Sequence, residues 1–175
     1  MGSPNSDAKR GPRAGAGVTH LQRKTVLYET GDTIKAVYFP ISSVVSLVVT
    51  LATGEMTEAA MVGNDGAVGM ASALDAKVSL SHAVVQLGGD AMVCDPAAFK
   101  GAALQSESLI SKVMRHEQTL FAQAQQSTAC MAHHEVDARL CRWLLRARAA
   151  VGSSNANQTT LPTGNLAEYP FKKVP

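Results

Sequence analysis

Residues 105–150 read QSESLISKVMRHEQTLFAQAQQSTACMAHHEVDARLCRWLLRARAA and contain neither proline nor glycine. They are rich in leucine, methionine, glutamine, arginine and alanine, which are good helix formers. Apolar side chains recur at three- and four-residue steps and so share one broad helical face: Leu109, Ile110, Val113, Met114, Leu120, Phe121, Ala124 and Met131. A second apolar stripe runs from Val136 to Ala147. We therefore expect two helices that join near 133–135.

The apolar band on the first helix leaves two interpretations open. Glu117 and Ser127 interrupt a strict heptad pattern, which favours one helix face packed against its own domain. The band is nevertheless wide for a single neighbour, which favours an additional helix from a second subunit. In that second interpretation the chain is a homodimer, and its interface is formed by Ile110, Val113, Leu120 and Ala124.

The chain before this helical stretch has the pattern of short strands and turns. We expect strands at Thr25–Tyr28, Ala36–Phe39, Val44–Leu51, Met56–Val62, His82–Leu87 and Ala91–Cys94. We expect about seven short strands in all, at roughly eight- to twelve-residue spacing, which is typical of a sandwich or roll. Met70–Leu74 can form one helical turn, and Asp95 followed by Pro96 is a helix start. The fold class is therefore α+β, a β-roll followed by a long helix and a short helical remnant.

The bulk composition limits the functional class. The formal net charge is only +2, so no general affinity for nucleic acid or acidic lipid follows. Cys94, Cys130 and Cys141 show no disulfide or metal spacing, which is typical of plain thiols in a cytoplasmic protein. The sequence has no run of about eighteen apolar residues, so it predicts neither a membrane helix nor a membrane partner. Residues 1–18 are rich in glycine, proline and alanine, and we expect a disordered tail there.

The order of these parts resembles the effector domain of the Crp/Fnr family of transcription regulators. The resemblance covers about residues 21–152. It rests first on a Tyr-x-x-Gly-x-x-Ile-x-x-Val-Tyr-Phe-Pro pattern at Tyr28, Gly31, Ile34, Val37, Tyr38, Phe39 and Pro40. It continues through Gly66, Val68-Gly69, Gly89-Asp90-Ala91, Glu135–Leu140 and Arg142–Leu145. Each motif alone is weak, but their order and spacing together are specific.

The resemblance implies a division of the chain into functional segments. Residues 19–103 would form a cyclic-nucleotide-binding-like β-roll, or jelly-roll, and residues 104–132 a long dimerisation helix. Residues 133–152 would be the first helix of a Crp-type DNA-binding domain. Residues 153–175 match only the beginning of a winged helix-turn-helix, and two prolines in 169–175 oppose a recognition helix there. DNA would thus be a partner only where a complete winged helix-turn-helix is supplied.

The same resemblance locates a degenerate phosphate-binding cassette. In the family a Gly-Glu motif and a later Arg bind the ribose and cyclic phosphate, because Arg supplies charged hydrogen bonds. Here the matching positions are Val68, Gly69, Met70, Ala71, Ser72, Ser81, His82 and Ala83. Met70 replaces the Glu and Ser81 replaces the Arg, whose charged hydrogen bonds would each contribute roughly 1.5–3 kcal/mol. We expect weak cyclic AMP binding at most, and a different effector or none.

The overall prediction is an effector-sensing and dimerisation domain that lacks a complete DNA-reading head. One alternative is a DNA-binding regulator that responds to a cyclic nucleotide or another small ligand, with Arg139, Arg142 and Arg146 on the DNA backbone. For these arginines we favour a solvated helix face. A second alternative is a cupin-like enzyme, which lacks its His-x-His ligands here. His133 and Asp137 have one-turn spacing but no third ligand, so no metal is predicted, and a cyclic nucleotide is the one cofactor that the resemblance leaves open.

Overall fold

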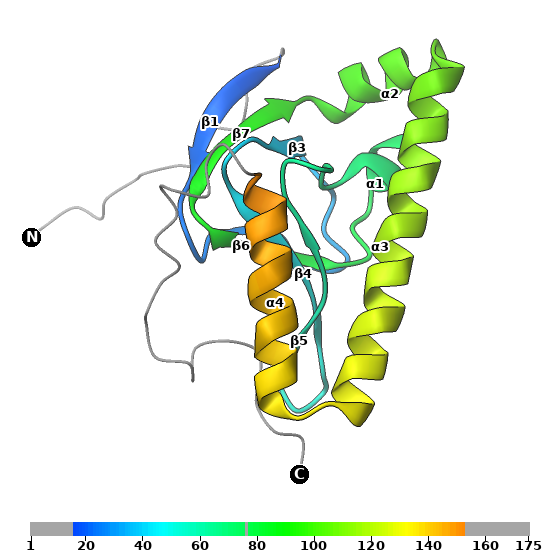
Figure 1. Cartoon of the computed structure of the whole chain (residues 1–175). Coiled ribbons are helices and arrows are strands. Elements are labelled where there is room, and N and C mark those ends of the chain that lie inside the picture. The colour runs from blue at the N-terminus through cyan, green and yellow to red at the C-terminus, as the bar shows by residue number, and fades with distance from the viewer. Residues whose placement is uncertain (1–15, 76, 153–175) are drawn as a thin grey trace, which may run out of the picture.

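The computed structural model describes residues 16–75 and 77–152 of the 175-residue chain. Two antiparallel sheets form a β-roll, with strand orders β1-β7-β3 and β2-β6-β4-β5 (Figure 1). The strands are β1 (Gly17–Leu21), β2 (Val26–Tyr28), β3 (Val37–Pro40), β4 (Val44–Thr50), β5 (Met56–Val62), β6 (His82–Leu87) and β7 (Gly89–Cys94). The predicted β-roll followed by helices is confirmed.

Four helices complete the described part of the chain: α1 (Met70–Leu74), α2 (Pro96–Leu104), α3 (Glu107–His133) and α4 (Val136–Val151). The predicted start of α2 is confirmed, because the Asp95 carboxylate accepts hydrogen bonds from the backbone N–H groups of Ala97 (2.9 Å) and Ala98 (3.0 Å). The predicted join is also confirmed, since His134 and Glu135 are extended. The chain reverses there, and α4 returns along the roll (Figure 1).

Strand β1 was not predicted from the sequence. Gly17 and Val18 were assigned to a disordered tail, but they pair with Val93 and Met92 of β7. Leu21 anchors the strand, because its side chain is buried with Val85 and Ala91. Pairing with β7 thus orders a glycine that composition alone assigns to a tail.

Strands β4 and β5 are apolar on both faces. Successive side chains of a strand point to opposite faces, so Val45 and Val62 enter the core of the roll while Val44 and Met61 point outward. Helix α4 covers the outer face with Trp143, Ala147, Ala150 and Val151, all of them buried. The predicted two-sided burial is thus correct for the first part of β4, whereas Val49 and Leu51 are exposed.

Polar side chains hold α4 on the roll and on α3. Arg142 donates to the Ser127 hydroxyl of α3 (2.8 Å), and Arg146 donates to the Asp65 carboxylate (2.9 Å) and the Met61 carbonyl (3.2 Å). We predicted a solvated face for these arginines, and for Arg142 and Arg146 that prediction is wrong. They face inward because α4 packs back onto the sheet beside α3.

Glu58 of β5 lies beneath α4 with its carboxylate at the centre of this interface. Its Oε2 accepts hydrogen bonds from the Ser46 hydroxyl and from Trp143 Nε1. Burial raises the pKa of this carboxyl above its ordinary value. The two hydrogen bonds and the nearby Arg142 and Arg146 oppose that rise without reversing it. The folded protein therefore holds the Glu58 proton more tightly than the unfolded chain does.

Two glycines of the β5–α1 loop permit close approach of the helices. A Cβ on Gly63 would lie 2.1 Å from the carbonyl oxygen of Ala150 in α4. A Cβ on Gly66 would lie 2.3 Å from Nε2 of His116 in α3. Among the three glycines of residues 63–69, only Gly69 has a positive φ, at 91°. At Gly63 and Gly66, glycine is required because a helix packs where a side chain would lie.

We predict that Gly66→Ala destabilises the fold through contact with His116. The added methyl group should lower the free energy of unfolding by roughly 1–3 kcal/mol, because the imidazole must move. The matched control is Gly101→Ala in α2, where an added Cβ meets nothing within 4 Å. That control should raise stability by about 0.5–1 kcal/mol. Urea unfolding measures both, and most of the Gly66→Ala loss should disappear in a His116→Ala background; equal losses in both backgrounds contradict the contact.

We also predict that Glu58→Gln changes how stability depends on pH. Since the folded pKa is raised, the contribution of Glu58 is fully present below the ordinary pKa of 4.5 and is lost as pH rises through the folded value. Glutamine can keep both hydrogen bonds without ionising. Between pH 4.5 and pH 8 the variant should therefore gain stability relative to the parent as the pH rises. Chemical unfolding across this range measures the difference, and a constant difference would refute the prediction.

Candidate functional site

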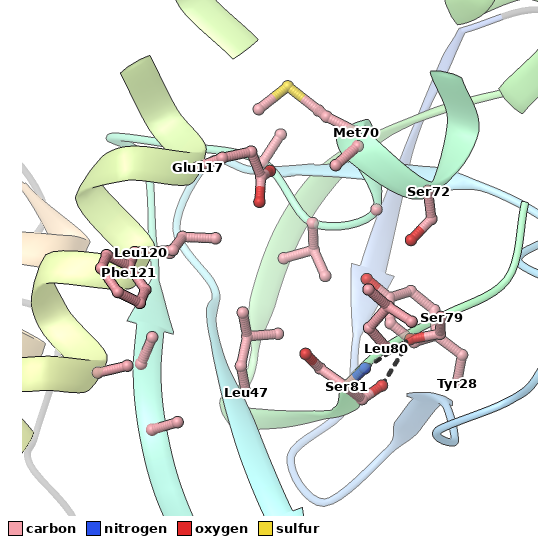
Figure 2. A pocket seen from close by; sticks show the side chains of 17 residues that line it. Tyr28, Leu47, Met70, Ser72, Ser79, Leu80, Ser81, Glu117, Leu120 and Phe121 are labelled. Carbon is pink, nitrogen blue, oxygen red and sulfur yellow. Dashed lines mark hydrogen bonds between the residues drawn. The ribbon is translucent and has the colours of Figure 1, made fainter. Parts of the chain in front are cut away.

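A pocket of about 300 Å³ lies between α1, the segment 79–81 and α3, and we call it the cassette pocket (Figure 2). Gly69 caps α1 with a left-handed φ of 91°, which places the loop backbone beside Tyr28. A Cβ at this glycine would lie 3.4 Å from the Tyr28 hydroxyl. Helix α3 closes the other side with Glu117, Leu120 and Phe121.

Six of the eight predicted ligand-binding residues line this pocket: Val68, Gly69, Met70, Ala71, Ser72 and Ser81. They come from two separate segments of the chain. Val68 and Gly69 precede α1 and the next three residues form its first turn, whereas Ser81 directly precedes β6. The structure thus brings the two halves of the predicted cassette to one site.

The remaining two predicted residues lie outside the lining of the pocket. Ala83 is fully buried in the core of the roll. His82 pairs through Nδ1 with the Glu29 carboxylate, and its side chain is only 12% exposed. Side chains alternate along a strand, so the residue next to Ser81 points away from the pocket. His82 therefore does not supply the charge that an arginine would bring.

The polar groups of the cassette pocket are mostly hydroxyls. The Ser79 hydroxyl donates to the Ser81 carbonyl (2.6 Å) and accepts from the Ser81 N–H (3.2 Å), which fixes this corner (Figure 2). The hydroxyls of Ser72 and Ser81 make no hydrogen bond within residues 16–75 and 77–152, so they can bind a ligand. No lysine, arginine or histidine lies among the described residues that line the pocket.

Among the described residues that line the pocket, one side chain is charged, and it is acidic. Glu117 extends from α3 towards α1, close to Met70 (Figure 2). The pKa of Tyr28 is raised above its ordinary value, first by burial and then by Tyr38 and the Glu117 carboxylate. The phenol therefore stays neutral and keeps its hydroxyl proton. The electrostatic environment opposes a phosphate and suits a neutral or cationic group.

The predicted dimer residues face the roll of their own protomer. Val113 is 2% exposed within the core, and Ile110 and Leu120 pack against the same cluster. Ala124 lines the cassette pocket. The exposed large apolar residues of α3 are instead Met114 (60% exposed) and Phe121 (66% exposed). Periodicity located the apolar band but did not show which edge of it the roll would cover.

Two further predictions concern the helix junction and the arginines. His133 ends α3 and Asp137 lies in α4, so the one-turn spacing that would pair them as metal ligands is not formed. The described residues hold no group of three or more His, Cys, Asp and Glu side chains that could bind a metal. The DNA-backbone role of Arg139 stays a prediction, whereas Arg142 and Arg146 are engaged within the protomer. The incomplete reading head was predicted for residues 153–175, outside the described residues.

Sequence reasoning missed four lining residues that shape the site: Tyr28, Ser79, Glu117 and Phe121. One signal was available for Glu117, because it interrupts the apolar pattern of the long helix. A charged residue on an otherwise apolar helix face often borders a cavity, and Glu117 borders the cassette pocket. Ser79 had no comparable signal, since it lies in a polar stretch that reads as an ordinary loop.

Comparison with known proteins identifies the architecture. No protein-family model and no curated protein sequence matches the chain. Solved structures do match, among them FixK2 from Bradyrhizobium japonicum, with a TM-score of 0.63 and 13% identity over 75% of this chain and 65% of that one. The c-di-GMP-responsive global regulator CLP from Xanthomonas campestris matches with a TM-score of 0.58 and 12% identity, over 74% of this chain and 65% of CLP.

A third match is a transcriptional regulator of the CRP family from Thermus thermophilus, with a TM-score of 0.57 and 21% identity over 73% of this chain and 62% of that one. The fold is that of Crp/Fnr regulators and cyclic-nucleotide-binding domains, as the sequence pattern predicted. The chain spans less than two thirds of the length of each of the three proteins. In the described part, no helix has both the length and the apolarity that a membrane span requires.

Proposed function

We propose that this chain is the effector-sensing and dimerisation part of a Crp/Fnr-type transcription regulator. The similar folds belong to regulators rather than to enzymes. The observation that carries the proposal is the cassette pocket, which is formed jointly by the roll and by α3. A ligand in this position contacts both parts at once. Ligand binding therefore has a direct physical route to the helix that we propose as the dimer seam.

The proposed effector is not a cyclic nucleotide. A cyclic phosphate needs a cationic partner, because charged hydrogen bonds supply roughly 1.5–3 kcal/mol each. The cassette pocket presents Ser81 where that cation would stand, and its charged group is the Glu117 carboxylate. Free hydroxyls and apolar walls favour a neutral or cationic small molecule. We therefore expect cyclic AMP to bind weakly or not at all.

The proposed dimer seam is the free face of α3. Met114, Phe121 and Thr128 are seven residues apart and exposed, which gives the two-turn repeat of a helix pair. The exposed Ala132 continues this face and would allow close approach. Phe121 also lines the cassette pocket, so a partner helix on this face would lie next to the ligand site.

Thermal unfolding with 1 mM cyclic AMP, about a hundred times a dissociation constant of roughly 10 μM, tests the effector proposal. We predict no shift of the midpoint for the parent chain, whereas a ligand at this excess would add about 2.7 kcal/mol. Ser81→Arg combined with Met70→Glu should create a shift, because the missing cation and ribose partner return. The control is His82→Arg, whose side chain points away from the pocket. A clear shift with the parent chain would refute the effector proposal.

Light scattering tests the dimer proposal. We predict that Phe121→Glu yields monomers, because burying an unpaired carboxylate in a helix seam costs several kcal/mol. The fold should survive, since Phe121 is 66% exposed within the protomer. The control Thr119→Glu lies on another face of α3, beside Gln123 and Arg146, and should leave the dimer intact. A dimer that persists in Phe121→Glu would place the seam elsewhere.

A further inference from the structure

A second cavity, of about 460 Å³, lies on another face of α3, and we call it the basic pocket. Its walls come from α3, from the loop between β5 and α1 and the ends of these two elements, from Phe39 of β3 and from Arg146 of α4. It shares only Ala67, Met70 and Leu120 with the cassette pocket. Cavities of this size commonly hold small ligands when a few polar groups converge on apolar walls.

The charges of the basic pocket are opposite to those of the cassette pocket. Lys112, Arg115 and Arg146 line it, against the single carboxylate of Asp65. Arg146 and Asp65 neutralise each other in an ion pair of 2.9 Å. The side chains of Lys112 and Arg115 make no hydrogen bond or ion pair with any described residue. Two cations are thus left to face an anionic partner.

Helical geometry brings these cations to one edge of the cavity. Lys112, Arg115 and Thr119 are three and four residues apart, so their side chains share one face of α3. Lys112 and Arg115 are exposed while lining the cavity, which places them at its rim. Behind this rim the walls include Val62, Met70 and Val113, all of them buried apolar side chains.

His116 shapes the cavity without adding a charge to its rim. Its Nε2 accepts a hydrogen bond from the Ala67 N–H (3.3 Å). An imidazole that accepts at Nε2 carries its proton on Nδ1, and Nδ1 faces the Glu117 carboxylate at 3.5 Å. The ring therefore fixes the β5–α1 loop against α3, and the charge at the rim comes from Lys112 and Arg115.

We infer that the basic pocket binds a small amphiphilic anion, with an apolar body and a carboxylate or phosphate headgroup. The headgroup contacts Lys112 and Arg115, and the body lies against Val62, Met70 and Val113. The residues that line the pocket favour a ligand with both an anionic headgroup and an apolar body. An inorganic anion would leave the apolar walls without a contact, and an uncharged ligand would leave both cations unpaired. This site is separate from the cassette pocket and does not depend on what that pocket binds.

Isothermal titration calorimetry of the full chain with octanoate tests this inference, with octanamide and inorganic phosphate as comparison probes at matched ionic strength. We expect one octanoate per chain, bound at least tenfold tighter than octanamide, and no saturation by phosphate in the same range. Lys112→Met with Arg115→Met keeps the apolar stems and should reduce octanoate to the affinity of octanamide. The control pair Arg23→Met with Lys35→Met removes the same charge from exposed positions outside both pockets and should bind like the parent.

A second variant locates the bound probe. Thr119→Trp adds an indole at the rim and should abolish octanoate binding while circular dichroism shows a retained fold. The inference is overturned if octanoate does not bind the parent chain, or if octanoate and octanamide bind it with equal affinity. It is also overturned if the preference for octanoate survives in the Lys112→Met, Arg115→Met double variant. Undiminished binding to a folded Thr119→Trp variant overturns it as well.

Discussion

The structure depends on two strands that are apolar on both faces. Strands β4 and β5 direct Val45 and Val62 into the roll and Val44 and Met61 outward, so the sheet needs a second layer on its outer side. Burying such side chains contributes roughly 1.5–3 kcal/mol each, which makes an uncovered outer face unfavourable. Helix α4 supplies the layer. Its return along the roll then brings Arg142 and Arg146 into contact with α3 and with the β5–α1 loop.

The sequence predicted the parts of this fold better than their contacts. Strand β5, α1, the start of α2 and the helix join at His134 followed from apolar periods and capping residues, which are local signals. The inward orientation of Arg146 did not follow, because its partner Asp65 is 81 residues away in the chain. The cassette was located from its resemblance to a known pattern. The sequence did not predict which face of α3 packs against the roll and which stays exposed, because both faces carry apolar residues.

Helix α3 separates two cavities of unlike character. Glu117 is turned to the cassette pocket, whereas Lys112 and Arg115, less than two turns earlier, border the basic pocket. Between them His116 contacts the loop backbone at Ala67 and the Glu117 carboxylate. One helix can therefore present opposite charges to two ligands because adjacent positions point in different directions. The small volume of Gly66 permits this, since a side chain there would displace the imidazole.

The β5–α1 loop also holds the C-terminal end of α4 in place. The Asn64 N–H donates to the Ala150 carbonyl (2.9 Å), and Gly63 lies against the same peptide group, so the last turn of the helix is fastened to this loop. Sixteen residues of helix are about 24 Å long. With that end as fulcrum, a tilt of about 5° moves the opposite end by about 2 Å, by the geometry of a helix of this length. Because Asn64 also lines the basic pocket, a displacement of that wall would be passed to the last turn of α4 and enlarged at its first.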